Sequence, residues 1–377
     1  MMSAIFSRRF AANYLSTLLI VCLAYWFLRD VSGFHRSMLQ AQWQFGNLDI
    51  DFVITVHRLF QSLIAFYAVI LIPYYARHPW MRSKASIFLQ GLWFSFLRLR
   101  RPLSRARAAR LKQPFRLPLK GALSGAAKQA GLALLLKFFF APLMINWCLA
   151  HAADMTNSVV QLIEGDRDAL TGRQLFDTWI FWAAFQAILF VDTFLFTIGY
   201  IIEMPALKNR IKSVDPTFFG WAICLLCYPP FNDLTGRFFE WQSSDFPHFE
   251  SNAVHYFANI CLLTALGIYS WASVALGLKA SNLTNRGIIA RGPYKYVRHP
   301  AYAAKNLAWW IGALPMFFAE MNSLNFKEAA YTLFALSAWT AIYALRAITE
   351  ERHLLMGNNG YAEYMQRVKW RFIPRVV

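Results

Sequence analysis

Two short segments of the sequence carry most of its chemically useful side chains. The first, RGPYKYVRHPAYAAKN at residues 291–306, places several cations and His299 directly before Pro300. Proline suits the first position of a helix, where its missing N–H costs nothing, and the free N–H groups of a helix N-terminus attract anions. Arg298 adds positive charge, and His299 adds a directional donor or acceptor. The segment predicts an anion pocket at the start of a helix, although an interfacial membrane anchor would use similar residues.

The second segment, LRAITEERHLLMGNNGYAEYMQRVKWRFIPRVV, closes the chain. Glu350 and Glu351 follow an apolar stretch, and acidic side chains near a helix C-terminus oppose the helix dipole. The pair is unfavourable unless a cation or hydroxyl groups bind it, and a plain solvated helix exit is the alternative. Arg346, four residues earlier on the same helical face, can pair with one of them. The tail then carries an apolar stripe that can fold back over the pocket: Tyr361, Tyr364, Val368, Trp370 and Phe372.

Composition places both segments in a membrane protein. The chain of 377 residues is 57% hydrophobic and only 15% charged, whereas soluble domains carry about 25% charged residues. Its net charge is +18, but the cations cluster in loops between apolar stretches. That pattern favours anionic membrane lipids as the partner of the basic loop 98–128, and few aromatic residues interleave its cations, so we expect no nucleic acid. The five cysteines lie in apolar segments, so we expect no disulfide framework and no metal.

Eight stretches are candidate membrane spans, because each approaches the length of about 20 apolar residues that a spanning helix needs. They are residues 10–28, 59–76, 131–150, 176–202, 217–232, 253–278, 303–320 and 331–348. The fifth is short and ends in Pro229-Pro230, so we expect it to be broken or only partly inserted.

The predicted fold is an all-α polytopic transmembrane bundle of about eight spans. Residues 1–130 form an N-terminal anchor with two spans and the basic loop, and residues 131–377 form the membrane domain with both polar segments.

Loop charge predicts the orientation of this bundle. Residues 77–128 hold thirteen Lys or Arg, whereas 151–174 and 233–252 hold more acidic than basic residues. Positively charged loops stay in the cytoplasm, which places both termini there. Residues 279–302 and 349–377 then face the same compartment. We therefore expect an integral protein of a bacterial inner membrane, with its site on the cytoplasmic face.

The two segments together resemble a known superfamily. GPYKYVRHPAY, then Arg-x-x-x-Glu-Glu, then GYAEYMQRV and RFIP are similar to the isoprenylcysteine carboxyl methyltransferase and phospholipid methyltransferase superfamily, whose members are integral membrane enzymes using S-adenosylmethionine. The resemblance implies methyl transfer from this cofactor to a lipid-borne or membrane-embedded carboxylate, amine or thiol. It implies cofactor binding by Tyr294, Arg298, His299, Pro300 and Tyr302 in the first motif and by Glu350 and Glu351 in the second. We also expect Ala304 and Tyr364 to contact the cofactor, and His299 and Arg346 to be the catalytic residues. Ala304 stands where the family usually has glycine, and the added methyl group would narrow the cofactor's approach.

Several alternatives stay open at this point. Membrane sterol reductases, which bind NADPH, have a similar tail, but they tend to carry Gly-Asp where this chain has Ala304-Lys305. A channel is disfavoured because the spans contain few polar residues, and these form no continuous row across the membrane. A non-catalytic lipid-binding protein that kept the motif is the third alternative.

The chemistry of the acceptor decides which side chains are needed. Arg346 suits a carboxylate or phosphate, whereas an amine or thiol needs a base, for which His299 and Glu203 are the candidates. Lys137 and Asp192 are ionisable residues within expected spans, and such residues indicate function. Their side chains can meet, or the Lys137 side chain can extend to the membrane–water interface instead. Lys279 and Arg286 lie outside the two motifs, so we expect neither to take part.

Overall fold

The structure is a computed structural model built almost entirely from helices. It describes residues 7–46, 52–100, 123–164, 172–357 and 359–376. The chain divides into two compact units, residues 1–41 with 55–140 and residues 42–54 with 141–377. The expected all-α class is confirmed. The first unit ends at Phe140, within a long helix, and residues 42–54 belong to the second unit.

The first unit is held together by hydrogen bonds between its helices as well as by apolar packing. In the described residues its helices are α2 (Arg8–Trp26), α3 (Gly33–Gln40), α4 (Val56–Arg77), α5 (Lys84–Arg100) and the beginning of α7 (Gly125–Glu164). The buried Asn13 amide donates to the Met81 carbonyl at 2.8 Å and accepts from the Ser83 backbone at 2.9 Å. Thr17 Oγ1 lies 3.0 Å from the Tyr75 hydroxyl. These bonds fix α2 against α4 and the start of α5. The basic loop expected to bind lipid lies largely at 101–122, outside the described residues.

The second unit contains both polar segments. Its elements are β1 (Gln42–Phe45), β2 (Phe52–Thr55), the rest of α7, α8 (Arg173–Leu175), α9 (Phe181–Ile201), β3 (Ser213–Val214), α10 (Phe218–Leu225), α11 (Asn232–Gly236), α12 (Asn252–Leu276), β4 (Thr284–Asn285), α13 (Pro300–Asn322), α14 (Phe326–Leu355) and α15 (Tyr361–Arg367). β1 pairs with β2. β3 pairs antiparallel with β4, with Ser213 opposite Asn285. Short helical turns at Pro205–Leu207, Gly277–Lys279 and Gly292–Lys295 and a π-helical turn at Phe176–Ile180 complete the described part of the unit.

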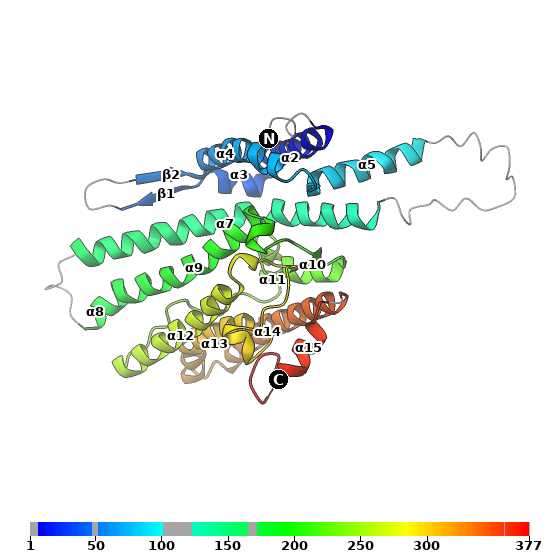
Figure 1. The fold of residues 1–377 in the computed structure, drawn as a ribbon. Helices are drawn as coiled ribbons and strands as arrows, with labels where there is room; N and C mark the ends of the chain where they lie inside the picture. Colours follow the sequence, from blue (N-terminus) through cyan, green and yellow to red (C-terminus); the bar gives the residue numbers. More distant parts are fainter. Residues whose placement is uncertain (1–6, 47–51, 101–122, 165–171, 358, 377) are drawn as a thin grey trace. The chain divides into compact units, whose positions relative to one another are not determined.

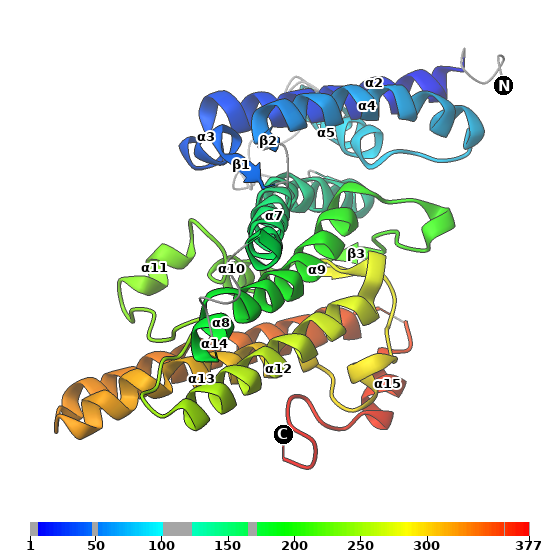
Figure 2. The same ribbon diagram turned by 90° about the vertical axis from the view of Figure 1, so that its left-hand side faces the viewer.

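Helices α12, α13 and α14 pack side by side, and α9 packs against α12 (Figures 1 and 2). Their shared core contains Phe181 and Phe185 of α9, Leu262, Ala265 and Leu266 of α12, and Ala308 of α13. The segment before α12 runs along α13, where the Ser244 backbone donates to the Gly312 carbonyl at 3.1 Å. A side chain at Gly312 would collide with the Ser244 carbonyl, so glycine permits this close approach.

Six helices of the described residues are long and apolar enough to cross a membrane: Arg8–Val31, Val56–Arg77, Gly125–Glu164, Arg173–Ile201, Asn252–Lys279 and Phe326–Leu355. Each coincides with an expected span. The expected span 217–232 is instead the eight-residue helix α10 followed by turns, which is shorter than the about 20 residues of a single spanning helix. The expected span 303–320 lies within α13, which has 23 residues but is not among the six.

Candidate functional site

The second unit contains a partly open cavity of about 180 Å³ between α9, α12, α13, α14 and α15. Seven of the side chains predicted to bind cofactor or acceptor line it: Tyr294, Arg298, His299, Tyr302, Arg346, Glu350 and Tyr364. Three predicted cofactor residues do not line it: Pro300, Ala304 and Glu351. The fold thus brings residues from both polar segments into one cavity.

Pro300 begins α13, as its backbone geometry requires. The chain before it pairs with the C-terminal tail, because the Arg298 and His299 backbone N–H groups donate to the Trp370 and Arg371 carbonyls, each at 2.9 Å. The tail's apolar stripe is buried as well, with Tyr361, Tyr364 and Val368 packed around Ile288 and Leu354. The tail therefore folds back over the motif and closes one side of the cavity.

Glu351 holds this arrangement together. The residue is 4% exposed, and its carboxylate accepts from Arg298 Nε at 2.8 Å, His299 Nε2 at 3.2 Å and Arg371 Nη2 at 2.8 Å. Arg298 also donates to the carbonyls of Val368 and Lys369. Both carboxylate oxygens of Glu351 are thus engaged by the protein. The geometry gives Glu351 a positioning role, joining α13, α14 and the tail.

Glu350 points elsewhere, although it is adjacent in sequence. Its half-buried carboxylate lines the cavity and accepts a hydrogen bond from the Tyr302 hydroxyl. Arg346 Nη2 lies 3.9 Å away, and His299 Nδ1 lies 3.8 Å away. The His299 ring stacks on Tyr302, with ring centroids 5.5 Å apart. Glu350 is therefore the carboxylate of the pair that a bound molecule can reach.

Arg346 is enclosed by three aromatic rings, and its 3.9 Å contact with Glu350 is its one ion pair among the described residues. It is 3% exposed, and its guanidinium carbon lies 4.9, 5.2 and 5.7 Å from the ring centroids of Tyr302, Tyr343 and Tyr228. Arg346 Nη2 donates to Asn282 Oδ1 at 3.0 Å, and its Nε has no hydrogen-bond partner among the described residues. Such cation–π contacts hold the charge without neutralising it, which leaves Arg346 able to bind an anion.

A second cation shares this part of the cavity. Lys305 of α13 lies against the rings of Tyr269, Trp309 and Tyr343, 5.4 to 6.0 Å from their centroids. We call the surroundings of Arg346 and Lys305 the tyrosine chamber, defined by Tyr228, Tyr269, Tyr302 and Tyr343. Sequence reasoning missed Lys305 as a site residue, although an ionisable residue within an expected span indicates function. No feature of the sequence indicated that Tyr228, Tyr269 and Tyr343 belong to the site.

The tail side of the cavity is lined by Tyr294, Tyr361 and Tyr364. Tyr364 donates its hydroxyl hydrogen to the Tyr294 carbonyl at 2.8 Å. Burial raises the pKa of the Tyr364 phenol to about 12 and also raises the pKa of Tyr294. Both phenols are therefore neutral at physiological pH, and they act there as hydrogen-bonding groups rather than as bases.

Two residues expected to be bystanders belong to the cavity. Lys279 and Arg286 both line it, which corrects their assignment as residues without a part in the site. Arg286 is 4% exposed and donates from Nη1 to the Asn209 carbonyl at 2.8 Å. Its Nε and Nη2 have no partner among the described residues. Arg286 directly follows strand β4, which pairs with β3. No local sequence pattern indicates this long-range pairing, so the sequence alone did not predict that Arg286 lines the cavity.

Other expected residues fall outside the cavity. Ala304 is buried and does not line it, so its methyl group does not narrow the cavity. Glu203 accepts from the Ile211 backbone at 3.0 Å and is not part of the lining. Asp192 accepts hydrogen bonds from Tyr269 and Ser273 of α12. Its expected pairing with Lys137, which belongs to the first unit, stays a prediction.

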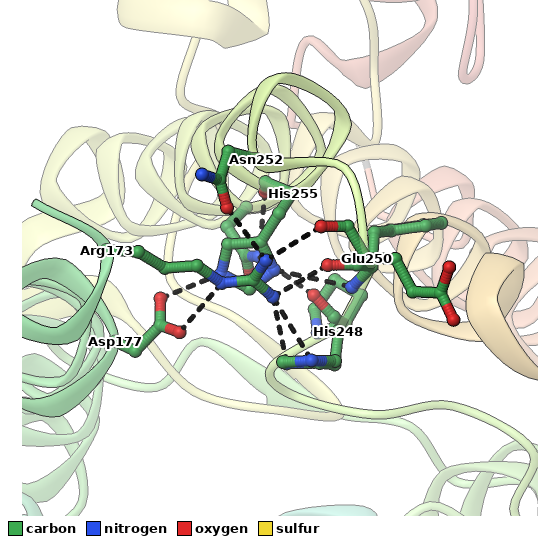
Figure 3. Close-up of polar contacts among 9 residues, drawn as sticks. Arg173, Asp177, His248, Glu250, Asn252 and His255 are labelled. Carbon is green, nitrogen blue, oxygen red and sulfur yellow. Dashed lines mark hydrogen bonds and ion pairs between the residues drawn. The ribbon is translucent and has the colours of Figure 1, made fainter.

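A separate polar cluster joins Arg173 of α8 and Asp177 to the start of α12 (Figure 3). Arg173 contacts Asp177 at 3.3 Å, donates to the Phe249 carbonyl at 2.6 Å and reaches His248, while the buried His255 meets Asp177 at 2.8 Å. His255 is fourteen residues before Tyr269, about 21 Å along the helix. The cluster fixes the segment before α12 and takes no part in the cavity.

Most of the residues that line the cavity lie in a segment that matches a known family model. Residues 255–356 match the model of the Isoprenylcysteine carboxyl methyltransferase (ICMT) family. This ICMT segment runs from α12 through α13 to the end of α14, and it includes Tyr269, His299, Lys305, Arg346 and Glu350. The resemblance of the motif to this superfamily is confirmed by the match. Neither the comparison with curated proteins nor the comparison with solved structures gave a match.

Proposed function

We propose that the chain is a membrane methyltransferase that moves a methyl group from S-adenosylmethionine to an acceptor embedded in the bilayer. The ICMT segment supports a membrane methyltransferase in general, and the six apolar helices support an integral membrane protein. The observation that carries the finer proposal is the cavity itself. It joins the His299 motif, the Glu350 carboxylate and the buried Arg346 in one space.

The lining residues fit the cofactor. S-adenosylmethionine carries an amino group, a carboxylate, ribose hydroxyls and a sulfonium cation. Glu350 offers a half-buried carboxylate to the amino group or a hydroxyl, and Arg286 offers two guanidinium nitrogens without partners to the carboxylate. Tyr294, Tyr361 and Tyr364 supply flat apolar surface on the tail side. When bound, the cofactor supplies an electrophilic methyl group and leaves as a neutral thioether.

Arg346 suits an acceptor with an anionic oxygen. Such an oxygen has no proton to lose, so the protein needs only to bind it, orient it and exclude water. A base for an amine or thiol is less well provided, because His299 Nε2 already contacts Glu351 and the tyrosines of the tail side are neutral. We therefore assign Arg346 to the acceptor and His299 to positioning Tyr302 and Glu350.

Binding of the product cofactor tests this proposal. The full-length protein in detergent should bind S-adenosylhomocysteine with a Kd of about 1 μM or tighter, which corresponds to about −8 kcal/mol. Titration calorimetry with NADPH serves as the parallel measurement. A preference for NADPH would assign the cavity to reductase chemistry instead. Methyl-tritiated cofactor incubated with membranes that contain or lack the protein should label a lipid-extractable product only when the protein is present.

A further inference from the structure

Lys305 is a cation without an anion in contact. Its ammonium group lines the cavity and faces the rings of Tyr269, Trp309 and Tyr343. Among the described residues it forms no hydrogen bond and no ion pair. An ammonium group has three N–H donors, and burying a charge without partners is costly. A bound group that accepts these hydrogen bonds would remove that cost.

The acidic residues nearby are committed to other partners. Both oxygens of Asp192 accept hydrogen bonds, one from Tyr269 and one from Ser273. Glu350 is bonded to Tyr302 and lies closer to Arg346 than to any other cation of the chamber. The charges of Asp192 and Asp245 act on Lys305 only from beyond ion-pair distance. The tyrosine chamber therefore keeps a positive charge at Lys305 that its own carboxylates do not neutralise by contact.

Lys305 and Arg346 face one shared ring. Arg346 Cζ lies 5.2 Å from the Tyr343 centroid, and Lys305 Nζ lies 6.0 Å from it. Lys305 also faces the Tyr269 ring, which a hydrogen bond from the Tyr269 hydroxyl to Asp192 holds in place. Two like charges are thus held near each other by rigid aromatic surfaces, with no carboxylate bridging them in an ion pair. Such an arrangement is suited to a ligand that brings its own negative charges.

We propose that Lys305 is a specificity-determining residue of the acceptor site, which binds a second anionic group on the acceptor head in addition to the group held by Arg346. This inference rests on the proposed function, because it takes the tyrosine chamber as the acceptor site. The acceptor is then a lipid whose head carries two acidic groups. The group at Arg346 receives the methyl group, and the group at Lys305 selects and aligns the molecule.

A matched pair of lipid probes tests the proposal without requiring turnover. Tetradecylsuccinic acid carries two carboxylates, and its monoamide has the same shape with one. Their affinities for the full-length protein, saturated with S-adenosylhomocysteine in a non-ionic detergent, are measured by calorimetry. The wild type should bind the diacid about tenfold tighter or more, as one charge-assisted hydrogen bond predicts. Lys305→Met should abolish this preference, and Lys305→Arg should keep it. Lys327→Met, an exposed cation of α14 outside the cavity, should change nothing.

The outcomes separate this inference from the proposed function. An unchanged preference in Lys305→Met, or no preference in the wild type, overturns the role of Lys305 while cofactor binding stands. If Lys305→Met also loses S-adenosylhomocysteine binding, the arginine variant decides, because a retained preference there supports the proposal and its loss overturns it. Failure of the wild type to bind S-adenosylhomocysteine would overturn the proposed function instead.

Discussion

Adjacent residues in this site have different tasks, and Glu350 and Glu351 show this most clearly. Successive residues on a helix point about 100° apart, so Glu350 faces the cavity while Glu351 faces the tail. Glu350→Gln should weaken S-adenosylhomocysteine binding by about 1–3 kcal/mol, because it removes the negative charge from a charge-assisted hydrogen bond. Calorimetry measures this loss, and Glu328→Gln on the exposed start of α14 is the control. Equal losses in both variants would show that Glu350 does not touch the cofactor.

Arg346 provides a second test at the residue scale. Arg346→Met fills a similar volume between the three tyrosine rings but removes the charge that we assign to the acceptor. Methyl transfer should fall by about a hundredfold or more, as the loss of a 3 kcal/mol interaction predicts, while S-adenosylhomocysteine binding stays within about threefold of the wild type. Arg352→Met, about 1.7 turns away and exposed, should leave both unchanged. Parallel loss of cofactor binding and transfer would place Arg346 on the cofactor instead.

The element that completes the site is the tail, which a buried charge cluster fastens to α13 and α14. Glu351 accepts from Arg298, His299 and Arg371, and removing one partner of a buried ion pair typically costs about 3–5 kcal/mol. Glu351→Gln should therefore free the tail rather than act on the cofactor alone. Hydrogen exchange at the backbone amides of Tyr364 and Val368, which pair with Gly360 and Tyr364, should accelerate in this variant.

Glu363→Gln serves as the matched control for the tail, because Glu363 is exposed on α15. If amide exchange in the tail is the same in Glu351→Gln and the wild type, the charge cluster does not hold the tail. Weakened S-adenosylhomocysteine binding in Glu351→Gln is also expected, since the released tail carries Tyr361 and Tyr364 away from the cavity wall.

At the scale of the whole molecule, the open question is how the helices traverse the bilayer. Loop charge places residues 279–302 and the C-terminus in the cytoplasm. Reporters fused after residues 110, 285 and 377 should read cytoplasmic, and reporters after 165 and 245 should read non-cytoplasmic. The fusion after 245 also tests the short helix α10, because a cytoplasmic reading there would mean that residues 204–245 do not cross. A cytoplasmic reading at 165 would contradict the orientation as a whole.

The sequence by itself determined the all-α class and the two polar segments, and six of its eight expected spans coincide with long apolar helices. These follow from local patterns, such as apolar runs of spanning length and proline at a helix start. It did not determine that Ala304 and Glu351 face away from the cavity while Arg286 and Lys305 line it. Membership in the cavity depends on how α9, α12, α13, α14 and the tail pack, and their contacts join residues far apart in the chain. Only tertiary packing could therefore decide which of two neighbouring glutamates meets a ligand and which lysine faces the tyrosine chamber.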